Sequence, residues 1–211
     1  MSRPALLAAL LSLVTFVTGC DDEALPPLPD SPSYVLTEAE GRPAQVYVPR
    51  DYDPATQYPL VVLLHGYGAG GGAQNLYFGL SNQTTAQQFI LLVPNGTRDS
   101  TGTSFWNSDP RISGETVDDV AYLRRLLAEA QANFRVDPQR VYLFGHSNGG
   151  FMSYRMACEA PDVITAIASL NGMPPEDASE CTPELPVSVL QIHGTADDTV
   201  LYDGRATDDG L

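Results

Sequence analysis

The sequence predicts an α/β fold: a mostly parallel sheet that helices cover on both faces. Short continuous apolar runs recur along the chain, which is the pattern of strands buried on both faces of a parallel sheet. Segments with helical spacing lie between these runs, and this alternation is typical of βαβ units. The length of 211 residues fits one domain, and a hydrophobic fraction of 43% can supply its core.

Six segments are predicted to be strands. The first, Gln45 to Val48, ends at Pro49, which cannot continue a ladder. The other five are short runs rich in aliphatic residues, at 60–64, 89–93, 141–144, 166–170 and 187–192. Several of them precede Gly-rich stretches, where a strand would turn into the next element.

Two helices are predicted between these strands. Apolar residues recur three or four apart from Val120 to Phe134, so they share one helix face. Thr116 followed by Asp119 has the spacing of a capping box, and Asp137-Pro138 is expected to turn the chain into the next strand. A second helix is expected from Met152 to Cys158, before Pro161.

The first twenty residues, 1–20, are predicted to be a lipoprotein-type signal peptide. Arg3 precedes an apolar run from Ala5 to Val17, which is shorter than the roughly 20 residues of a membrane span. The run ends in Val17-Thr18-Gly19-Cys20, which resembles a bacterial lipobox whose Cys carries lipid. An ordinary signal peptide that contains a Cys is the alternative. Both readings predict an exported protein, either membrane-anchored through Cys20 or secreted.

Residues 21–33 combine Pro with acidic residues and are expected to form an extended tether, so the folded domain is expected to span 34–211. Without Cys20, Cys158 and Cys181 remain, and an even pair in an oxidising compartment is a disulfide candidate. Two buried free thiols are the alternative. The formal net charge of −15 argues against a nucleic-acid partner. No metal site or cofactor is predicted, because His and Cys are few and the paired Asp residues lack ligand spacing.

The pentapeptide Gly145-His146-Ser147-Asn148-Gly149 is a G-x-S-x-G motif between a predicted strand and a predicted helix. A sharp strand-to-helix turn exposes the Ser hydroxyl, and the flanking glycines remove side chains that would clash. The nearby helix N-terminus favours developing negative charge. Ser147 is therefore the candidate nucleophile, and the backbone N–H of Asn148 is a candidate oxyanion donor.

Two further segments fit the same chemistry. His65-Gly66-Tyr67-Gly68 follows a predicted strand, and the Tyr67 N–H is the candidate second oxyanion donor. Asp197 follows the last predicted strand and comes after Ser147, in the order Ser, Asp, His. It is the candidate triad acid, with Asp198 as the competing carboxylate. His65 is expected to have a structural role.

Together these segments resemble the polyhydroxybutyrate depolymerase / feruloyl esterase family of secreted α/β hydrolases. The resemblance rests on His65–Gly68, Phe144–Gly150, Tyr154–Cys158 and His193–Asp197, and covers about Tyr34 to Gly204. It implies an α/β-hydrolase fold and a carboxylic ester hydrolase with Ser147 as nucleophile, Asp197 as acid and an oxyanion hole at Tyr67 and Asn148. It also supports a Cys158–Cys181 bridge. Polyhydroxyalkanoate, feruloyl and acetyl-xylan esters all remain open as substrates, polymeric ones included.

One part of the family pattern is missing. The family's general base is a His after the triad acid, but residues 198–211 contain no His. His65, His146 and His193 all precede Asp197, and adjacent side chains on an elbow diverge, so none of them is expected to act as the base. The sequence therefore predicts a C-terminally incomplete hydrolase whose sheet lacks its last strand and helix.

Three function classes stay open on these grounds. The first is a serine esterase that works through an acyl-enzyme. The second is an acyltransferase or peptidase, because fold does not determine reaction. The third is a non-catalytic surface lipoprotein, which the missing His favours.

The polar segment 94–115 is a long loop, and long loops in compact domains are usually functional. It carries Trp106, for which two roles are open. Trp106 either lines the substrate pocket or fills the space under the loop as a hydrophobic plug.

Overall fold

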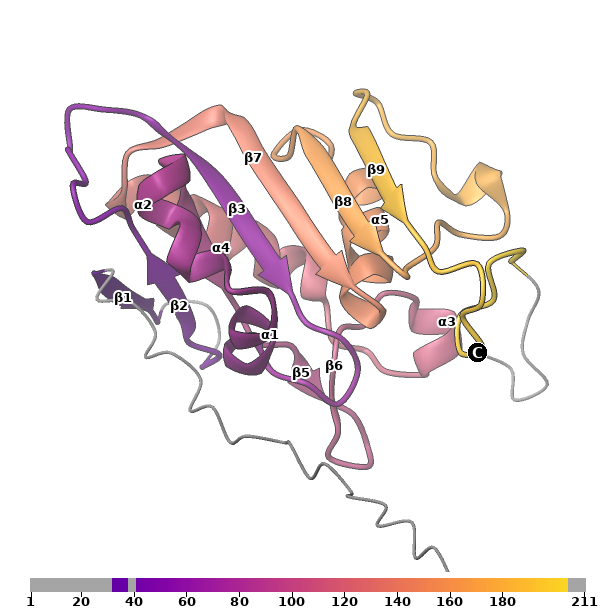
Figure 1. The fold of residues 1–211 in the computed structure, drawn as a ribbon. Coiled ribbons are helices and arrows are strands. Elements are labelled where there is room, and N and C mark those ends of the chain that lie inside the picture. Colours follow the sequence, from indigo (N-terminus) through magenta and orange to yellow (C-terminus); the bar gives the residue numbers. More distant parts are fainter. Residues whose placement is uncertain (1–31, 38–40, 205–211) are drawn as a thin grey trace, which may run out of the picture.

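The computed structural model describes residues 32–37 and 41–204. Within them, seven strands form one sheet in the order β1-β2-β4-β3-β7-β8-β9 (Figure 1). Strands β4, β3, β7, β8 and β9 pair in parallel, whereas β2 pairs antiparallel with β1 and β4. The strands are β1 (Ser33–Leu36), β2 (Ala44–Tyr47), β3 (Tyr58–Leu64), β4 (Ile90–Val93), β7 (Val136–His146), β8 (Ala166–Leu170) and β9 (Ser188–Ile192).

Helices lie on both faces of this sheet. In Figure 1, α1 and α2 lie on the face toward the viewer, and α4 and α5 lie behind it. In the chain, a small hairpin formed by β5 and β6 and then the short α3 follow β4 and precede α4. Their bounds are α1 (Gly71–Phe78), η1 (Leu80–Gln83), α2 (Thr84–Gln87), β5 (Thr97–Arg98), β6 (Ser104–Phe105), α3 (Pro110–Ser113), α4 (Asp119–Asn133), α5 (Asn148–Glu159) and η2 (Ala178–Glu180).

The central strands are buried on both faces, as their continuous apolar runs predict. Leu60, Val62 and Leu64 alternate into one apolar cluster, which α4 and α5 cover. Leu63 points into a second cluster on the opposite face, with Leu91 of β4. This arrangement is the α/β-hydrolase fold, so the predicted fold class is confirmed.

The six predicted strands are all present, with corrections at element ends. Strand β7 begins at Val136 and includes Asp137-Pro138, because the β3–β7 register shifts there and accommodates the proline. Helix α4 is capped by Asp118, whose carboxylate accepts the Ala121 N–H at 2.9 Å, so the predicted capping box at Thr116 is wrong. Helix α1 has no counterpart in the predictions, since its glycine-rich start hides the helical pattern.

Strand β9 is an edge of the sheet in the part of the chain that the structure describes, pairing with β8 alone. Val189, Leu190 and Ile192 are 51%, 57% and 46% exposed. The predicted signal peptide, its Cys20 and nearly all of the tether lie outside the described residues. Among the described helices, none combines the length and apolar character that a membrane span needs.

Candidate active site

Ser147 lies in the turn from β7 to α5, with φ of 52° and ψ of −120°. A positive φ is uncommon for a residue with a side chain, and such strain persists only where neighbours enforce it. Here the Ser147 N–H donates to the Leu170 carbonyl of β8 at 2.7 Å. The Ser147 carbonyl accepts the N–H groups of Gly150 and Phe151, at 2.7 and 3.0 Å. The sheet and the first turn of α5 therefore hold the elbow from both sides.

The glycines around Ser147 are required by close backbone contacts. A Cβ on Gly145 would lie 2.0 Å from the Gly149 carbonyl oxygen, and one on Gly149 would lie 2.3 Å from the Leu64 carbonyl oxygen. A Cβ on Gly150 would lie 2.7 Å from Ser169 Oγ. These distances explain why the motif is written with glycine at each position: the elbow packs directly against β3 and β8.

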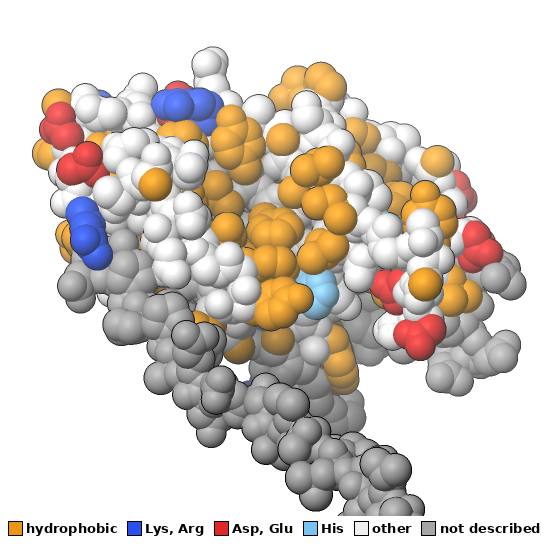
Figure 2. Space-filling view, in the orientation of Figure 1, with side chains coloured by type: hydrophobic (Ala, Val, Ile, Leu, Met, Phe, Trp, Pro, Cys, Tyr) orange, Lys and Arg blue, Asp and Glu red, His pale blue; other side chains and the backbone are white. Residues whose placement is uncertain are grey.

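A cavity of about 280 Å³ opens beside the elbow. Its walls come from the loop after β3, from α1 and from the end of β7: Gly66, Tyr67, Ala69, Ala73, Gln74, Tyr77, His146 and Ser147. Ser147 Oγ has no hydrogen-bond partner within residues 32–37 and 41–204. On the face shown in Figure 2, charged side chains lie toward the rim, whereas hydrophobic side chains gather near the centre, beside a histidine. The nucleophile candidate thus faces an uncharged cavity.

The loop that carries Tyr67 is held against Ser147. A Cβ on Gly66 would lie 3.3 Å from His146 Nδ1 and in van der Waals contact with Ser147 Cβ at 3.5 Å, and the Gly66 N–H donates to Gln74 Oε1 at 3.1 Å. The Tyr67 hydroxyl donates to Asp99 at 2.5 Å. Hydrogen bonds from Thr101, the larger cause, and from Tyr67 lower the pKa of Asp99 to about 2. The Tyr67 N–H has no acceptor among the described residues, so it is free to donate to a ligand.

Asn148 is the first residue of α5, so its N–H belongs to the amides that have no intrahelical acceptor. Its side chain has a second role that the motif did not reveal. Asn148 Oδ1 accepts the Trp106 N–H at 2.6 Å, and Nδ2 donates to the Trp106 carbonyl at 2.9 Å. The elbow is thereby joined to the loop between β4 and α4.

Trp106 is 1% exposed and is not among the residues that line the cavity. Its ring packs 5.0 Å from the ring of His65, and its Nε1 donates to the His65 carbonyl at 3.1 Å. The prediction that Trp106 lines the substrate pocket is therefore wrong for this cavity. The side chain is instead the hydrophobic plug under the loop, because the Asn148 contacts hold its backbone inward.

Asp197 lies in the turn after β9, and Asp198 beside it is more exposed. The Asp197 carboxylate accepts the N–H groups of Val200 and Thr199, both at 2.9 Å, and these bonds lower its pKa. Charge on His193 and His146 lowers the pKa further. Asp197 is therefore held ionised in the neighbourhood of the elbow, which is the state a triad acid needs.

The three histidines have different surroundings. His65 Nε2 accepts the Gly96 N–H at 2.9 Å, so Nδ1 carries the proton and donates to the Gly66 carbonyl. Burial lowers the pKa of His65, which keeps it neutral and structural, as predicted. His193 uses both ring nitrogens as well, toward Gln191 and the Val200 carbonyl.

His146 lines the cavity, and desolvation lowers its pKa while Asp197 opposes that shift. It forms no hydrogen bond with Ser147 Oγ in the described structure. Neither do His65 and His193, whose ring nitrogens have other partners. The described residues therefore place a candidate nucleophile next to two candidate oxyanion donors and a candidate acid near His146, but none of the three histidines forms a hydrogen bond with Ser147 Oγ.

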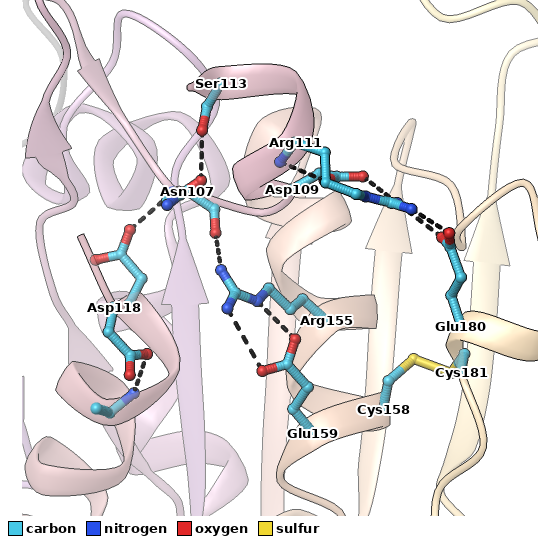
Figure 3. A network of polar contacts seen from close by, with 12 residues as sticks. Asn107, Asp109, Arg111, Ser113, Asp118, Arg155, Cys158, Glu159, Glu180 and Cys181 are labelled. Carbon is cyan, nitrogen blue, oxygen red and sulfur yellow. Dashed lines mark hydrogen bonds and ion pairs between the residues drawn. A yellow bond between two sulfur atoms is a disulfide. The ribbon is translucent and has the colours of Figure 1, made fainter. Parts of the chain in front are cut away.

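A polar network ties the far end of α5 to the loops beside it (Figure 3). Arg155 of α5 donates to the Asn107 carbonyl at 2.5 Å and to Glu159 at 2.8 Å. Arg111 donates to Asp109 and to Glu180, and Cys158 of α5 is bonded to Cys181, next to Glu180. The structure contains this Cys158–Cys181 disulfide, which links the segment between β8 and β9 to the helix that begins at the elbow.

Sequence reasoning missed Gln74, which is 5% exposed and whose side chain accepts the Gly66 N–H in the loop that carries Tyr67. The available signal was a polar residue that directly follows the run of Gly and Ala residues at 68–73. Within the described residues, no group of three His, Cys, Asp or Glu side chains could hold a metal ion.

Comparison with known proteins identifies the family that this chain matches. The family model described as "Putative esterase" matches residues 39–190. Among curated proteins, "Putative esterase NocK" of Nocardia uniformis is 33% identical over 152 residues, which cover 71% of this chain and 43% of that protein. The chain thus spans less than half of that relative.

Two fungal relatives are named by their substrates. "Bifunctional acetylxylan esterase/xylanase XynS20E" of Neocallimastix patriciarum is 28% identical over 80% of this chain and 23% of its own length. "Probable feruloyl esterase C" of Aspergillus niger is 27% identical over 97% of this chain and 73% of its own length. Among solved structures, a thermostable esterase has a TM-score of 0.60 at 20% identity, over 83% of this chain and 49% of that one.

Proposed function

The chain belongs to the esterase family, and we propose that it is an exported serine carboxylic ester hydrolase that works through an acyl-enzyme. One observation carries the proposal: Ser147 Oγ, without a hydrogen-bond partner in the described structure, lies at a strained strand-to-helix turn beside a cavity. Tyr67 lines the same cavity and Asn148 directly follows Ser147 at the start of α5, so their N–H groups are the proposed oxyanion donors. A nucleophile next to two amide donors is the arrangement that acyl transfer requires.

In the proposed reaction, Ser147 Oγ attacks the ester carbonyl carbon while its proton passes to a general base. The carbonyl oxygen gains negative charge and accepts hydrogen bonds from the Tyr67 and Asn148 amides. The bond to the alcohol then breaks, the alcohol takes up the proton, and an acyl-enzyme remains on Ser147. Water attacks this ester and releases the acid. Asp197 would hold the base in the correct tautomer and stabilise its cation.

We assign the role of general base to none of the three histidines. All three histidines of the chain lie among the described residues, and two of them use both ring nitrogens in other hydrogen bonds. His146 adjoins Ser147 in sequence, but it is the last residue of β7 and its ring forms no hydrogen bond with Ser147 Oγ in the described structure. The same observation favours the second candidate function, a non-catalytic surface lipoprotein, because Ser147 without a base stays protonated.

For the ester itself, we propose feruloyl or acetyl groups on plant polysaccharide. The names of two fungal relatives support this class, and the aromatic walls of Tyr67 and Tyr77 suit a flat acyl group. The cavity volume of about 280 Å³ is close to the lower end, about 300 Å³, of small-molecule sites. Polyhydroxyalkanoate esters stay a weaker proposal. Export rests on the N-terminal segment, with membrane anchoring through Cys20 or secretion as the two forms.

Active-site labelling tests the proposal. The full-length protein is treated with a fluorophosphonate probe, beside Ser147→Ala and the matched control Ser100→Ala, which changes an exposed serine of the loop after β5. We expect labelling of the parent and the control, and none of Ser147→Ala. Labelling that survives in Ser147→Ala would refute the assigned nucleophile. A folded parent that takes up no label would favour the non-catalytic alternative for this chain. Release of ferulate or acetate from feruloylated and acetylated xylan then identifies the ester.

A further inference from the structure

A second cavity, of about 330 Å³, lies on the other side of α1 from Ser147. It is lined by Val35, Pro43, Ala44, Gln45, Tyr47, Gly72, Val93 and Asn95. None of these residues lines the cavity beside Ser147. Its volume lies within the range of about 300–1,000 Å³ that is typical of small-molecule sites.

The sheet builds one wall of this second cavity. Gln45 and Tyr47 are two positions apart on β2, so their side chains point to the same face. The register places Val35 of β1 and Val93 of β4 on either side of Gln45. The cavity therefore has an apolar floor of aliphatic side chains, with a carboxamide and a phenol standing on it.

The polar groups of the cavity are available to a ligand. Within the described ranges, the side chains of Gln45 and Tyr47 have no hydrogen-bond partner. Asn95 Oδ1 accepts the Gly71 N–H at 2.9 Å, which orients the amide and leaves its Nδ2 to donate elsewhere. A carboxamide and a phenol can each donate and accept, which matches hydroxyl groups.

The absence of charged side chains from the lining of the second cavity narrows the class of ligand further. None of the lining residues is charged, and the formal net charge of −15 disfavours an anionic ligand. Uncharged side chains also dominate the centre of the face that carries α1 (Figure 2). A ligand with hydroxyl groups, C–H faces for the apolar floor and no charge is a neutral carbohydrate.

Helix α1 relates the two cavities to each other. Ala73, Gln74 and Tyr77 line the cavity beside Ser147, whereas Gly72 lines the second one. A helix with its side chains is about 10–12 Å across, so the two cavities are about one helix diameter apart. An oligosaccharide could occupy the second cavity while an ester on the same polymer reaches Ser147.

We propose that the cavity between β2 and α1 binds a neutral, xylan-type segment of the polysaccharide that carries the ester. The identity of the ligand rests on the proposed function, while the site itself rests on the lining residues. Gln45 and Tyr47 give specificity through hydrogen bonds to sugar hydroxyls. The apolar floor binds the C–H face of a sugar ring.

The test measures binding of an unesterified ligand, so that no turnover is needed. Xylohexaose is titrated calorimetrically into the full-length protein, with polygalacturonate as the anionic comparison. Gln45→Ala and Tyr47→Phe each remove one polar group, and Gln87→Ala changes an exposed glutamine of α2 as the matched control. We expect xylohexaose to bind, each cavity variant to weaken binding about fivefold, and the control to leave it unchanged. Polygalacturonate should not bind.

Fluorophosphonate labelling of the same samples separates this inference from the proposed function. Labelled protein that does not bind xylohexaose, or that binds it equally well in both folded cavity variants, would overturn the inference and leave the esterase proposal standing. Binding that depends on Gln45 and Tyr47 in a protein that takes no label would support the inference while the esterase proposal fails. Circular dichroism of each variant confirms that the fold is intact.

Discussion

The Asn148→Ala substitution tests whether the elbow depends on its attachment to the Trp106 loop. The Asn148 carboxamide pairs with the backbone of Trp106 in both directions, accepting at 2.6 Å and donating at 2.9 Å. Trp106 is 1% exposed, so water cannot easily replace the lost partners. The substitution leaves the backbone amide of residue 148 in place, and with it the proposed oxyanion donor.

The expected loss of stability follows from the two groups that lose their partners, the N–H and the carbonyl of Trp106. A buried donor or acceptor without a partner costs about 1–3 kcal/mol, so losing both partners predicts a loss of about 2–6 kcal/mol in the free energy of unfolding. Domains of this size have a total stability of about 5–15 kcal/mol. The variant should therefore lose a large fraction of its total stability, or should release the loop locally.

Urea unfolding followed by tryptophan fluorescence measures both outcomes, because Trp106 is the single tryptophan of the chain. We expect a lower unfolding midpoint and, if the loop is released, a red-shifted emission before global unfolding. Asn133→Ala is the control, since its exposed amide donates only to the Glu129 carbonyl of its own helix. A change below about 0.5 kcal/mol in Asn148→Ala, with unchanged emission, would refute this account of the elbow.

Three further predictions concern packing, covalent linkage and pH. Gly145→Ala should destabilise the fold by about 3 kcal/mol or more, because its Cβ would lie 2.0 Å from a backbone oxygen, and thermal melting measures this. Reducing the Cys158–Cys181 bond should cost about 3 kcal/mol, since it closes a loop of 23 residues; urea unfolding with and without a reductant tests it. Burial lowers the pKa of His65 and His146 below the ordinary 6.5. As the pH falls, these two histidines are therefore protonated in the unfolded chain before they are protonated in the folded one. Their contribution to stability is complete above pH 6.5 and is lost as the pH falls toward the lowered folded values, which urea midpoints from pH 7.5 to 5 will show.

Each of these predictions has its own comparison. Gly72→Ala should be tolerated, because a Cβ there would meet nothing within 4 Å, and equal melting of the two glycine variants would contradict the packing argument. A Cys158→Ala/Cys181→Ala protein should be insensitive to the reductant. In His146→Gln the pH dependence should shrink to the part due to His65, and an unchanged slope would exclude His146 as a contributor.

Local patterns carried much of the prediction. The apolar runs of the strands need no long-range information, because a strand buried on both faces is apolar at every position. The G-x-S-x-G motif likewise implies its own geometry, since the Ser147 turn forces its glycine neighbours against β3 and β8. Helix α1 escaped prediction because Gly71 and Gly72 are poor helix formers, and tertiary contacts stabilise the helix instead.

The role of a side chain inside a loop could not be predicted in the same way. Trp106 is an aromatic residue in a long loop, so it could line a pocket or fill the core. Only the pairing of its backbone with Asn148 decides between these two roles. The neutral state of His65 likewise depends on the Gly96 N–H, which is 31 positions away in the sequence.

The sequence by itself determined the strand-helix alternation, the elbow at Ser147, and the presence of an aspartate but no histidine in residues 197–211. These features are local or compositional, so spacing and residue type suffice to state them. The tertiary structure alone decided which groups meet: the Tyr67 loop against Ser147, the Asn148 bonds to Trp106, and the uncharged cavity between β2 and α1. Those contacts join residues far apart in the chain, and their free energy depends on distance and burial, which the order of residues does not contain.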